Sequence, residues 1–128
     1  MSVKELQSRL EEVLSPEQII TAELCAACEV DGMLPALVAR PNDVAQVELV
    51  LSLCADGGLA VIPWGSGVHI RVGNVPAAYD LALDLGGLDQ VFEYDADNLT
   101  LNAGAGCTLK NLERLLEEQN QILPLDPR

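Results

Sequence analysis

Aromatic and basic side chains are scarce in this chain of 128 residues. Phe, Trp and Tyr together make up 3% of it, and seven Lys and Arg stand against 20 Asp and Glu, which gives a formal net charge of −13. Proteins that bind single-stranded nucleic acid combine aromatic stacking platforms with positive charge. A surface this acidic instead repels nucleic acid and anionic lipid at long range. An anionic ligand must therefore be held locally, by backbone N–H groups or helix N-termini.

Long apolar runs are also missing. No run approaches the length that spans a bilayer, and residues 1–14 alternate charged and apolar side chains, unlike a signal peptide. A cytoplasmic protein is therefore expected. The single Cys-x-x-Cys pair, Cys25 and Cys28, has no second pair and no neighbouring histidine, so no metal or redox site is predicted. The four cysteines are interpreted as small buried apolar residues.

Two helices are predicted in residues 1–30, which are interpreted as an N-terminal helical unit. Residues 3–14 place their leucines on one side of a helix. Ser15, Pro16 and Gln18 then form a helix-start pattern, with Ser15 as the cap and Gln18 closing a capping box. The second helix is expected to end near residue 24.

Residues 31–128 alternate strand and helix patterns. A strand over residues 35–38, a helix over 44–55 and a buried strand over 59–63 form a βαβ unit, so the two strands are expected to be parallel. The side chains expected on the inner face of that helix are Val44, Val47, Leu51 and Cys54. Further strands are predicted over residues 81–85, 90–94 and 99–103, and a helix over 108–120. The fold class is α/β (α+β), with a small mixed or parallel sheet and flanking helices.

A glycine-rich loop, Pro63-Trp64-Gly65-Ser66-Gly67-Val68-His69, follows the buried strand. Glycine lets the backbone approach a ligand closely, and consecutive N–H groups can then converge on a phosphate. The loop therefore predicts a phosphate site, with an ordinary turn as the alternative from these residues alone. His69 is the only histidine, and it is interpreted as a polar loop residue rather than a catalytic one.

A second glycine turn, Asn102-Ala103-Gly104-Ala105-Gly106, lies between a predicted strand and a predicted helix. It begins like the dinucleotide fingerprint GxGxxG, but Leu109 stands where the third small residue is needed. Asp126 lies about 20 residues further on, where a ribose-binding acid would be. A Rossmann-like NAD-binding module is therefore one alternative.

Taken in order, these segments resemble the FAD-binding domain of the vanillyl-alcohol oxidase and p-cresol methylhydroxylase (PCMH) superfamily. Within it, the sequence is most similar to the FAD-binding subunits of bacterial glycolate oxidases. The segments that carry the resemblance are residues 35–41, 61–67, 73–76, 83–85, 95–101, 105–109 and 121–127. The resemblance covers about residues 30 to 128, and it implies that residues 31–128 are the first part of a PCMH-type FAD-binding domain, truncated at its end.

The resemblance also implies which positions bind FAD, and that the FAD is bound without a covalent bond. The family's pyrophosphate loop maps onto Trp64, Gly65, Ser66, Gly67, Val68 and His69, and further positions that line the FAD site map onto Ala105, Gly106, Leu125, Asp126 and Pro127. In members with a covalent flavin, the tethering histidine aligns with Val68, and His69 is one residue late. Many members have arginine where Trp64 stands. No catalytic residue is assigned.

The function implied is that of one part of a flavin-dependent oxidoreductase. Its substrate is expected to be a small 2-hydroxy acid such as glycolate or lactate, which transfers a hydride to FAD. Because the family's second FAD-binding half and substrate domain are missing, this stretch alone is expected to be inactive. Partner subunits of a glycolate-oxidase-like complex are expected, without nucleic acid or membrane insertion. A non-catalytic α/β module that docks partner subunits is a second alternative.

Overall fold

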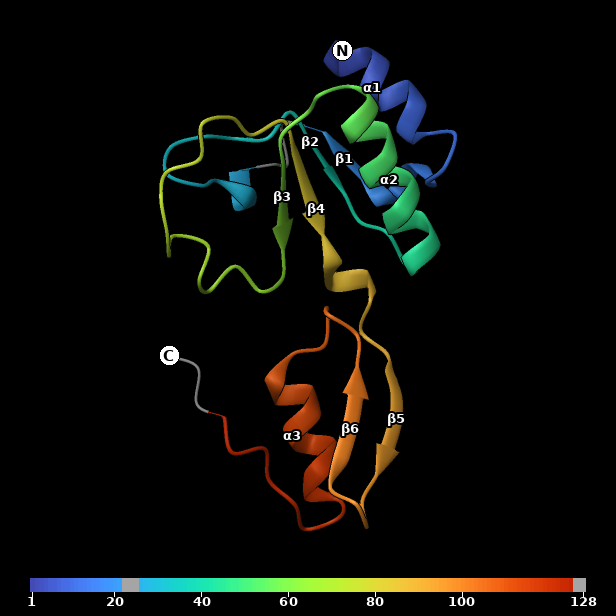
Figure 1. Ribbon diagram of the computed structural model, residues 1–128, viewed down its shortest axis with the longest axis vertical. Coiled ribbons are helices and arrows are strands. Elements are labelled where there is room, and N and C mark those ends of the chain that lie inside the picture. Colours follow the sequence, from blue (N-terminus) through green and yellow to red (C-terminus); the bar gives the residue numbers. More distant parts are fainter. Residues whose placement is uncertain (22–25, 126–128) are drawn as a thin grey trace.

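The computed structural model describes residues 1–21 and 26–125 of the chain. Figure 1 shows a four-stranded sheet with two helices at one end of the molecule, and a two-stranded hairpin with one helix at the other. The strands of the larger sheet are, in spatial order, β1 (Ile19–Thr21), β2 (Leu37–Ala39), β4 (Leu81–Asp84) and β3 (Val61–Trp64). The hairpin pairs β5 (Val91–Asp95) with β6 (Thr100–Ala103). The helices are α1 (Val3–Leu10), α2 (Val44–Asp56) and α3 (Leu109–Glu117), with short 3-10 turns η1 (Pro16–Gln18) and η3 (Leu85–Gly87).

The larger sheet is mixed, as expected from the sequence. β2 and β3 both run parallel to β4, which lies between them, and β1 pairs with β2 in the antiparallel direction. The expectation that the strands flanking α2 are parallel is therefore confirmed, although they are not neighbours. β4 is apolar at three successive positions, Leu81, Ala82 and Leu83, which are all buried. A strand covered on both faces needs such an uninterrupted apolar run.

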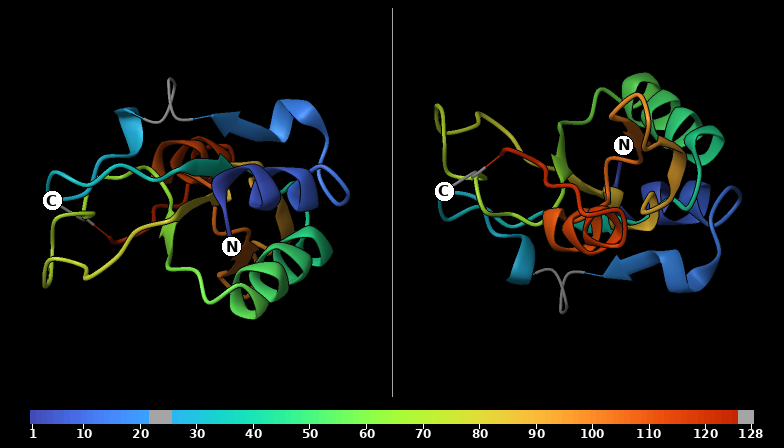
Figure 2. Two further views of the ribbon diagram at one scale, coloured as in Figure 1. Left: turned by 90° about the horizontal axis from the view of Figure 1, so that it is seen from above. Right: turned by 90° about the horizontal axis from the view of Figure 1, so that it is seen from below.

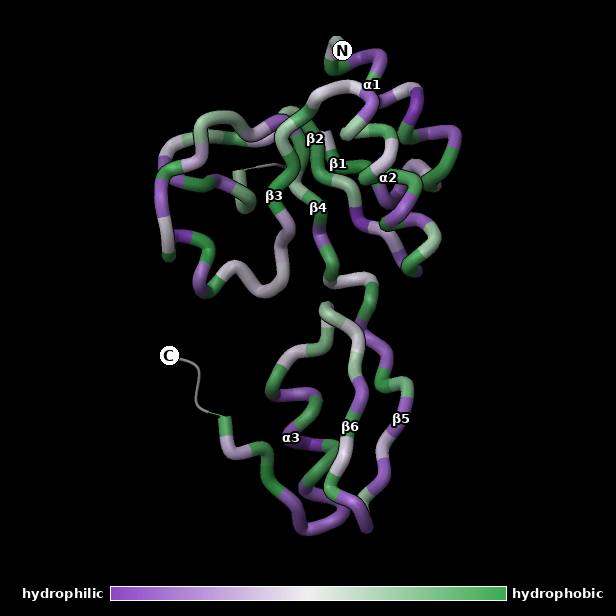
Figure 3. Tube along the Cα trace, viewed as in Figure 1, coloured by the Kyte–Doolittle hydropathy of each residue, from purple (hydrophilic) through white to green (hydrophobic). Residues whose placement is uncertain are grey.

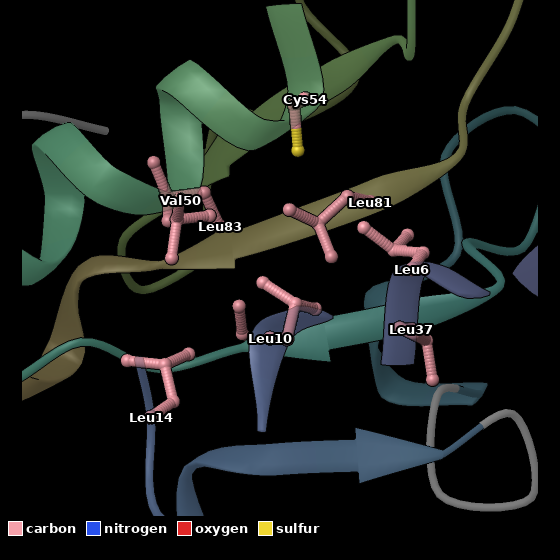
Figure 4. Close-up of a cluster of buried hydrophobic side chains, with 9 residues drawn as sticks. Leu6, Leu10, Leu14, Leu37, Val50, Cys54, Leu81 and Leu83 are labelled. Atoms are coloured by element: carbon pink, nitrogen blue, oxygen red, sulfur yellow. The ribbon is translucent and has the colours of Figure 1, made fainter. Parts of the chain in front are cut away.

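One face of the larger sheet packs against α1 and α2. Figure 4 shows Leu6 and Leu10 from α1, and Val50 and Cys54 from α2, meeting the leucines of β2 and β4. On the described residues, no helix is long and apolar enough to span a membrane. Burial of the Cys54 thiol raises its pKa, and the nearby carboxylate of Asp80 adds to this effect, which fits its interpretation as an apolar core residue.

The inner face of α2 differs from the one predicted. Val44 and Leu51 are 62% and 43% exposed, whereas Val50 is fully buried beside Cys54, and Val47 packs partly against them. The prediction was wrong for Val44 and Leu51 because apolar residues surround much of α2. Its sequence pattern therefore does not determine which stripe faces the sheet; the packing partners do.

The predicted second helix is also wrong. Only the turn η1 forms after Ser15, and the chain then enters β1, whose Ile19 pairs with Ala39 of β2. The Gln18 side chain does accept a hydrogen bond from the Ser15 backbone N–H over 2.9 Å, as the capping box requires. Ile19 and the two residues after it are β-branched and favour a strand, and the open edge of β2 supplies the partner. Residues 22–24 of the predicted helix lie outside the described residues.

The other face of the larger sheet is covered by loops. Figures 1 and 2 show α1 and α2 on one side of the sheet, and residues 26–36 with the long loop after β3 on the other. The buried residues on this side are Val30, Val38, Trp64, Tyr79 and Ala82. Even numbered residues of β2 and β4 thus face the loops while their neighbours face the helices, as the two-residue period of a strand requires.

Close backbone packing joins the hairpin unit to the end of β4. A Cβ atom on Gly104 would lie 2.0 Å from the carbonyl oxygen of Leu88, and one on Gly106 would lie 2.2 Å from the carbonyl oxygen of Leu85. The Gly106 N–H donates to the Leu88 carbonyl over 3.0 Å. Residues 104–106 therefore cross η3 with no side chain between the two backbones, which places the start of α3 beside the end of the larger sheet.

The hairpin unit forms as predicted from residue 90 onward. Asp95 accepts hydrogen bonds from the Asn98 backbone and side chain in the turn between β5 and β6, and the side-chain bond is the main cause that lowers the pKa of Asp95. Figure 3 shows this turn as hydrophilic, whereas the strands of the larger sheet are mainly hydrophobic. The Tyr94 hydroxyl donates to Gln121 Oε1 over 2.8 Å, which ties β5 to the segment after α3.

Substitution of Gly106 by alanine should lower the free energy of unfolding by about 1 to 3 kcal/mol, the usual cost of forcing extra atoms into a packed site. The reason is the overlap between the new methyl group and the Leu85 carbonyl oxygen. Urea unfolding followed by circular dichroism measures it. Gly65→Ala is the matched control, because no atom lies within 4 Å of a Cβ there and Gly65 does not adopt a positive φ. Equal urea midpoints for the two variants would contradict the tight crossing.

Candidate functional site

The loop after β3 presents backbone donors that the fold does not use. Gly67 adopts a positive φ of 76°, and the loop closes through bonds from Ile70 N–H to Gly67 O over 3.3 Å and from Val72 N–H to His69 O over 3.0 Å. The N–H groups of Ser66, Gly67 and Val68 donate to no other described residue. Three successive amide donors are thus available for a ligand, and consecutive N–H groups of this kind can form anion sites in loops.

A cavity of about 310 Å³ lies between this loop and the start of α3. It is lined by Gly65, Ser66, Val68 and His69 from the loop and by Ala105, Gly106, Cys107, Thr108 and Leu109 from the second glycine turn. The two segments are far apart in the sequence, and the crossing of residues 104–106 over η3 brings them together. Six residues to which the family resemblance gave a cofactor role thus share one cavity.

The start of α3 adds a second set of donors to this cavity. The Thr108 side chain caps the helix by accepting a bond from the Asn111 N–H over 3.3 Å. The N–H groups of Leu109 and Lys110 in the first turn donate to no other described residue. Free N–H groups and the helix dipole together favour an anion at such a terminus. The cavity therefore lies between two elements that offer unused N–H groups.

Trp64 has a different position from the one its motif suggests. Its side chain is 8% exposed and does not line the cavity. The indole N–H donates to the Tyr79 hydroxyl over 2.6 Å, and the ring lies beneath Gly67, where a Cβ would be 2.7 Å from Trp64 Cζ3. The lack of a side chain at Gly67 therefore serves packing on Trp64. A contact between Trp64 and the cofactor stays a prediction. Because the side chain does not line the cavity, such a contact would be made by the Trp64 backbone.

The C-terminal positions of the predicted site are not brought to this cavity. Leu125 is 61% exposed and is not among the cavity's lining residues. Asp126 and Pro127 lie outside the described residues. The cofactor role of all three stays a prediction.

Three lining residues were not predicted. Cys107, Thr108 and Leu109 follow the second glycine turn directly, and the helix cap at Thr108 was the signal that could have found them. The Cys107 thiol donates to the Asp89 carbonyl oxygen over 3.0 Å. Tyr79, whose hydroxyl accepts the hydrogen bond from Trp64 at the base of the loop, belongs to none of the sequence motifs. Within residues 1–21 and 26–125, no cluster of three His, Cys, Asp or Glu could hold a metal ion.

A larger cavity lies elsewhere but offers less chemistry. It measures about 500 Å³ and is formed by β5, β6, the end of α3 and the segment after it, with Tyr94, Leu101 and Leu116 among its lining residues. None of its lining residues carries a charge at neutral pH, and it has no helix N-terminus of the kind that borders the smaller cavity. The smaller cavity is therefore the better candidate for an anionic ligand.

The Rossmann-like alternative does not have the required geometry. In that fold the glycine fingerprint follows a strand of a parallel sheet. Here β6 precedes the second glycine turn, and among the described residues it pairs with β5 alone, in the antiparallel direction. The backbones of Gly104 and Gly106 also pack closely against the carbonyl groups of Leu88 and Leu85, at the positions where a dinucleotide fingerprint would leave room for a ligand. These glycines shape the crossing, and the unused amide donors lie in the first loop.

Comparison with known proteins identifies relatives by sequence. The model of a family described as "FAD binding domain" matches residues 35–128. A probable D-2-hydroxyglutarate dehydrogenase, mitochondrial, from Oryza sativa subsp. indica is 37% identical over 90 residues, which are 70% of this chain and 16% of that protein. Glycolate oxidase subunit GlcD of Bacillus subtilis (strain 168) is 27% identical over 94 residues, 73% of this chain and 20% of the relative.

Solved structures show the same fold. An alkyldihydroxyacetonephosphate synthase matches with a TM-score of 0.82 at 22% identity, over 99% of this chain and 29% of that one. A p-cresol methylhydroxylase with substrate bound matches with a TM-score of 0.80 at 14% identity, over 91% of this chain and 25% of that one. The expected fold, that of PCMH-type FAD-binding domains, is confirmed. This chain spans 16% of the length of the first curated relatives that it matches.

Proposed function

The chain belongs to the FAD-binding domain family, and we propose that the cavity between the loop after β3 and the start of α3 holds the pyrophosphate of FAD. The observation that carries this proposal is the set of unused N–H groups at Ser66, Gly67 and Val68. A Cβ on Gly65 would meet no atom within 4 Å, so this residue leaves open space where a phosphate can approach the backbone.

Backbone donors suit the charge of this chain. Fixed N–H dipoles can hold a pyrophosphate without Lys or Arg, and the net charge of −13 leaves few cations to spare. The N-terminus of α3 would face the second side of the same group, with Leu109 and Lys110 offering their N–H groups. The share of these residues in the reaction is to bind and orient the cofactor, while bound FAD supplies the redox chemistry.

We further propose that residues 31–128 form the N-terminal part of the FAD-binding domain of a longer oxidoreductase for small 2-hydroxy acids. Similar proteins named D-2-hydroxyglutarate dehydrogenase, putative D-lactate dehydrogenase and glycolate oxidase subunit support this substrate class. The substrate would lose a hydride from its α-carbon to FAD and a proton from its hydroxyl group, which leaves a 2-oxo acid. We assign no described residue as the base that takes this proton.

For the whole protein we also propose partner subunits. The relative named as a glycolate oxidase subunit supports partner subunits for the whole protein, and a non-catalytic docking module remains the competing proposal. Flavin absorbance separates the two, because a docking module would take up no FAD. The cytoplasmic location expected from the sequence stays a prediction, since several similar proteins are named as mitochondrial.

Gly65→Val should reduce FAD retention roughly tenfold or more in the full-length protein, because the new side chain fills the space beside the loop amides. The ratio of flavin absorbance to protein absorbance measures retention, and urea unfolding checks that the fold is kept. Ser66→Ala is the control, since it removes a hydroxyl group but keeps the N–H donor. Full flavin content in Gly65→Val would place the phosphates elsewhere. Gly67 is unsuitable for this test because a side chain there would displace Trp64.

FAD should leave the protein completely on acid precipitation. The position that matches the family's tethering histidine is Val68, which has no nucleophile, and the neighbouring His69 is exposed on the rim of the cavity. Flavin absorbance of the supernatant and the pellet measures the outcome. Flavin that stays in the pellet would show a covalent bond and contradict the non-covalent prediction.

Small 2-hydroxy acids should bleach the flavin of the full-length protein in the absence of oxygen. D-2-hydroxyglutarate, D-lactate and glycolate are the compounds to compare, with the corresponding unsubstituted acids as controls that lack the oxidisable hydroxyl group. Loss of the flavin absorbance band reports the transfer of two electrons. If no 2-hydroxy acid bleaches a protein that retains FAD, the substrate class is wrong while the cofactor site stands.

A further inference from the structure

A chain of hydrogen bonds runs beneath the loop after β3. The Trp64 indole N–H donates to the Tyr79 hydroxyl over 2.6 Å, and that hydroxyl donates to the Cys28 carbonyl oxygen over 3.0 Å. Trp64 is the last residue of β3, and Tyr79 lies two residues before β4. The bonds therefore connect the base of the loop, the approach to β4 and the segment around residue 28.

The hydroxyl of Tyr79 suits this central place. An indole can only donate and a carbonyl can only accept, whereas a phenol hydroxyl does both at once. Trp64 and Tyr79 are 8% and 7% exposed, so water does not readily replace either bond. Buried polar groups that lose their partner are costly, and this cost holds the Trp64 ring in one orientation.

The Trp64 ring in turn determines the path of the loop. The loop passes over the ring at Gly67, so closely that a Cβ there would lie 2.7 Å from Cζ3. Ile70, at the far end of the same turn, packs against the cluster that contains Trp64 and Tyr79. The free N–H groups of Ser66 to Val68 lie on the span between these two contacts, so a tilt of the ring would shift the donors directly.

We propose that Tyr79 is a positioning residue for the phosphate loop. Its hydroxyl holds the Trp64 ring, and the ring holds the amide donors of residues 66–68 in the arrangement that binds the FAD pyrophosphate. This inference rests on the proposed function, because it requires the loop to be the phosphate site. Neither Tyr79 nor the Trp64 side chain lines the cavity, so both act through the loop.

The two tyrosines of the chain provide a matched experiment. Tyr79→Phe and Tyr94→Phe each remove one hydroxyl that donates a hydrogen bond and keep the ring, but Tyr94 belongs to the hairpin unit and bonds Gln121. We expect Tyr79→Phe to weaken FAD binding by the full-length protein about tenfold, and to speed amide hydrogen exchange at residues 66–70 before FAD is added. Tyr94→Phe should match the wild type in both measurements. A purely structural role of Tyr79 would change stability and leave both unchanged at temperatures where the protein is folded.

Trp64→Phe tests the same chain from its other end. It removes the donor together with Cζ3 and Cη2, two of the indole atoms that lie beneath Gly67, so its effect on affinity should be at least as large as that of Tyr79→Phe. The double variant should lose less affinity than the sum of the two single losses, because both substitutions remove the bond between Trp64 and Tyr79. Trp64→Phe also decides the question if Tyr79→Phe does not fold.

The possible outcomes distinguish a failure of the positioning role of Tyr79 from a failure of the proposed FAD site. Wild-type affinity and wild-type exchange in Tyr79→Phe would overturn the positioning role while the FAD site stands. Additive losses in the double variant would also overturn it, because they would show that the two side chains act independently. A wild-type protein that takes up no FAD would overturn the proposed function, and with it the part of this inference that concerns the pyrophosphate. In that case, faster amide exchange at residues 66–70 in Tyr79→Phe would still support the role of Tyr79 in ordering the loop.

Discussion

The contact on which the rest of the structure depends is the crossing of two bare backbones. Residues 104–106 pass over η3 so closely that a methyl group on Gly104 or Gly106 would overlap a carbonyl oxygen. This contact fixes where α3 begins relative to the end of β4. Since β3 lies beside β4, the loop after β3 then faces the start of α3, and a cavity forms between two sets of amide donors. The cavity thus depends on the glycines of the second turn, because only residues without a side chain allow the two backbones to pack so closely.

The features that the sequence predicts well are local ones. Glycines two apart after a strand, a Thr before a leucine-rich run and a Pro after a Ser each determine a turn or a cap within a few residues. These signals located the loop at Gly65–His69, the turn at Ala105–Gly106 and the helix after Thr108, and their order along the chain identified the family. Six predicted residues therefore meet in one cavity although no single motif was decisive.

The features that escape sequence reasoning are decided by distant partners. Ile19 and its neighbours follow a helix-start pattern, yet they form β1 because the edge of β2 is open to them. The apolar residues of α2 surround the helix, so only packing selects Val50 over Leu51. The bond from Trp64 to Tyr79 spans 15 residues and follows no spacing rule. Trp64 therefore reads as a site residue in the motif, while in the structure its side chain supports the loop from below.

Trp64 has a consequence for observation as well as for structure. It is the only tryptophan of the chain, and it lies buried directly under the loop that we assign to the pyrophosphate. Within these 128 residues, its emission therefore reports the polarity and rigidity of that one place without a label and without a second indole. The excited indole can also pass its energy to a flavin held nearby. The molecule thus carries its own optical probe at the point where cofactor binding is expected to be felt first.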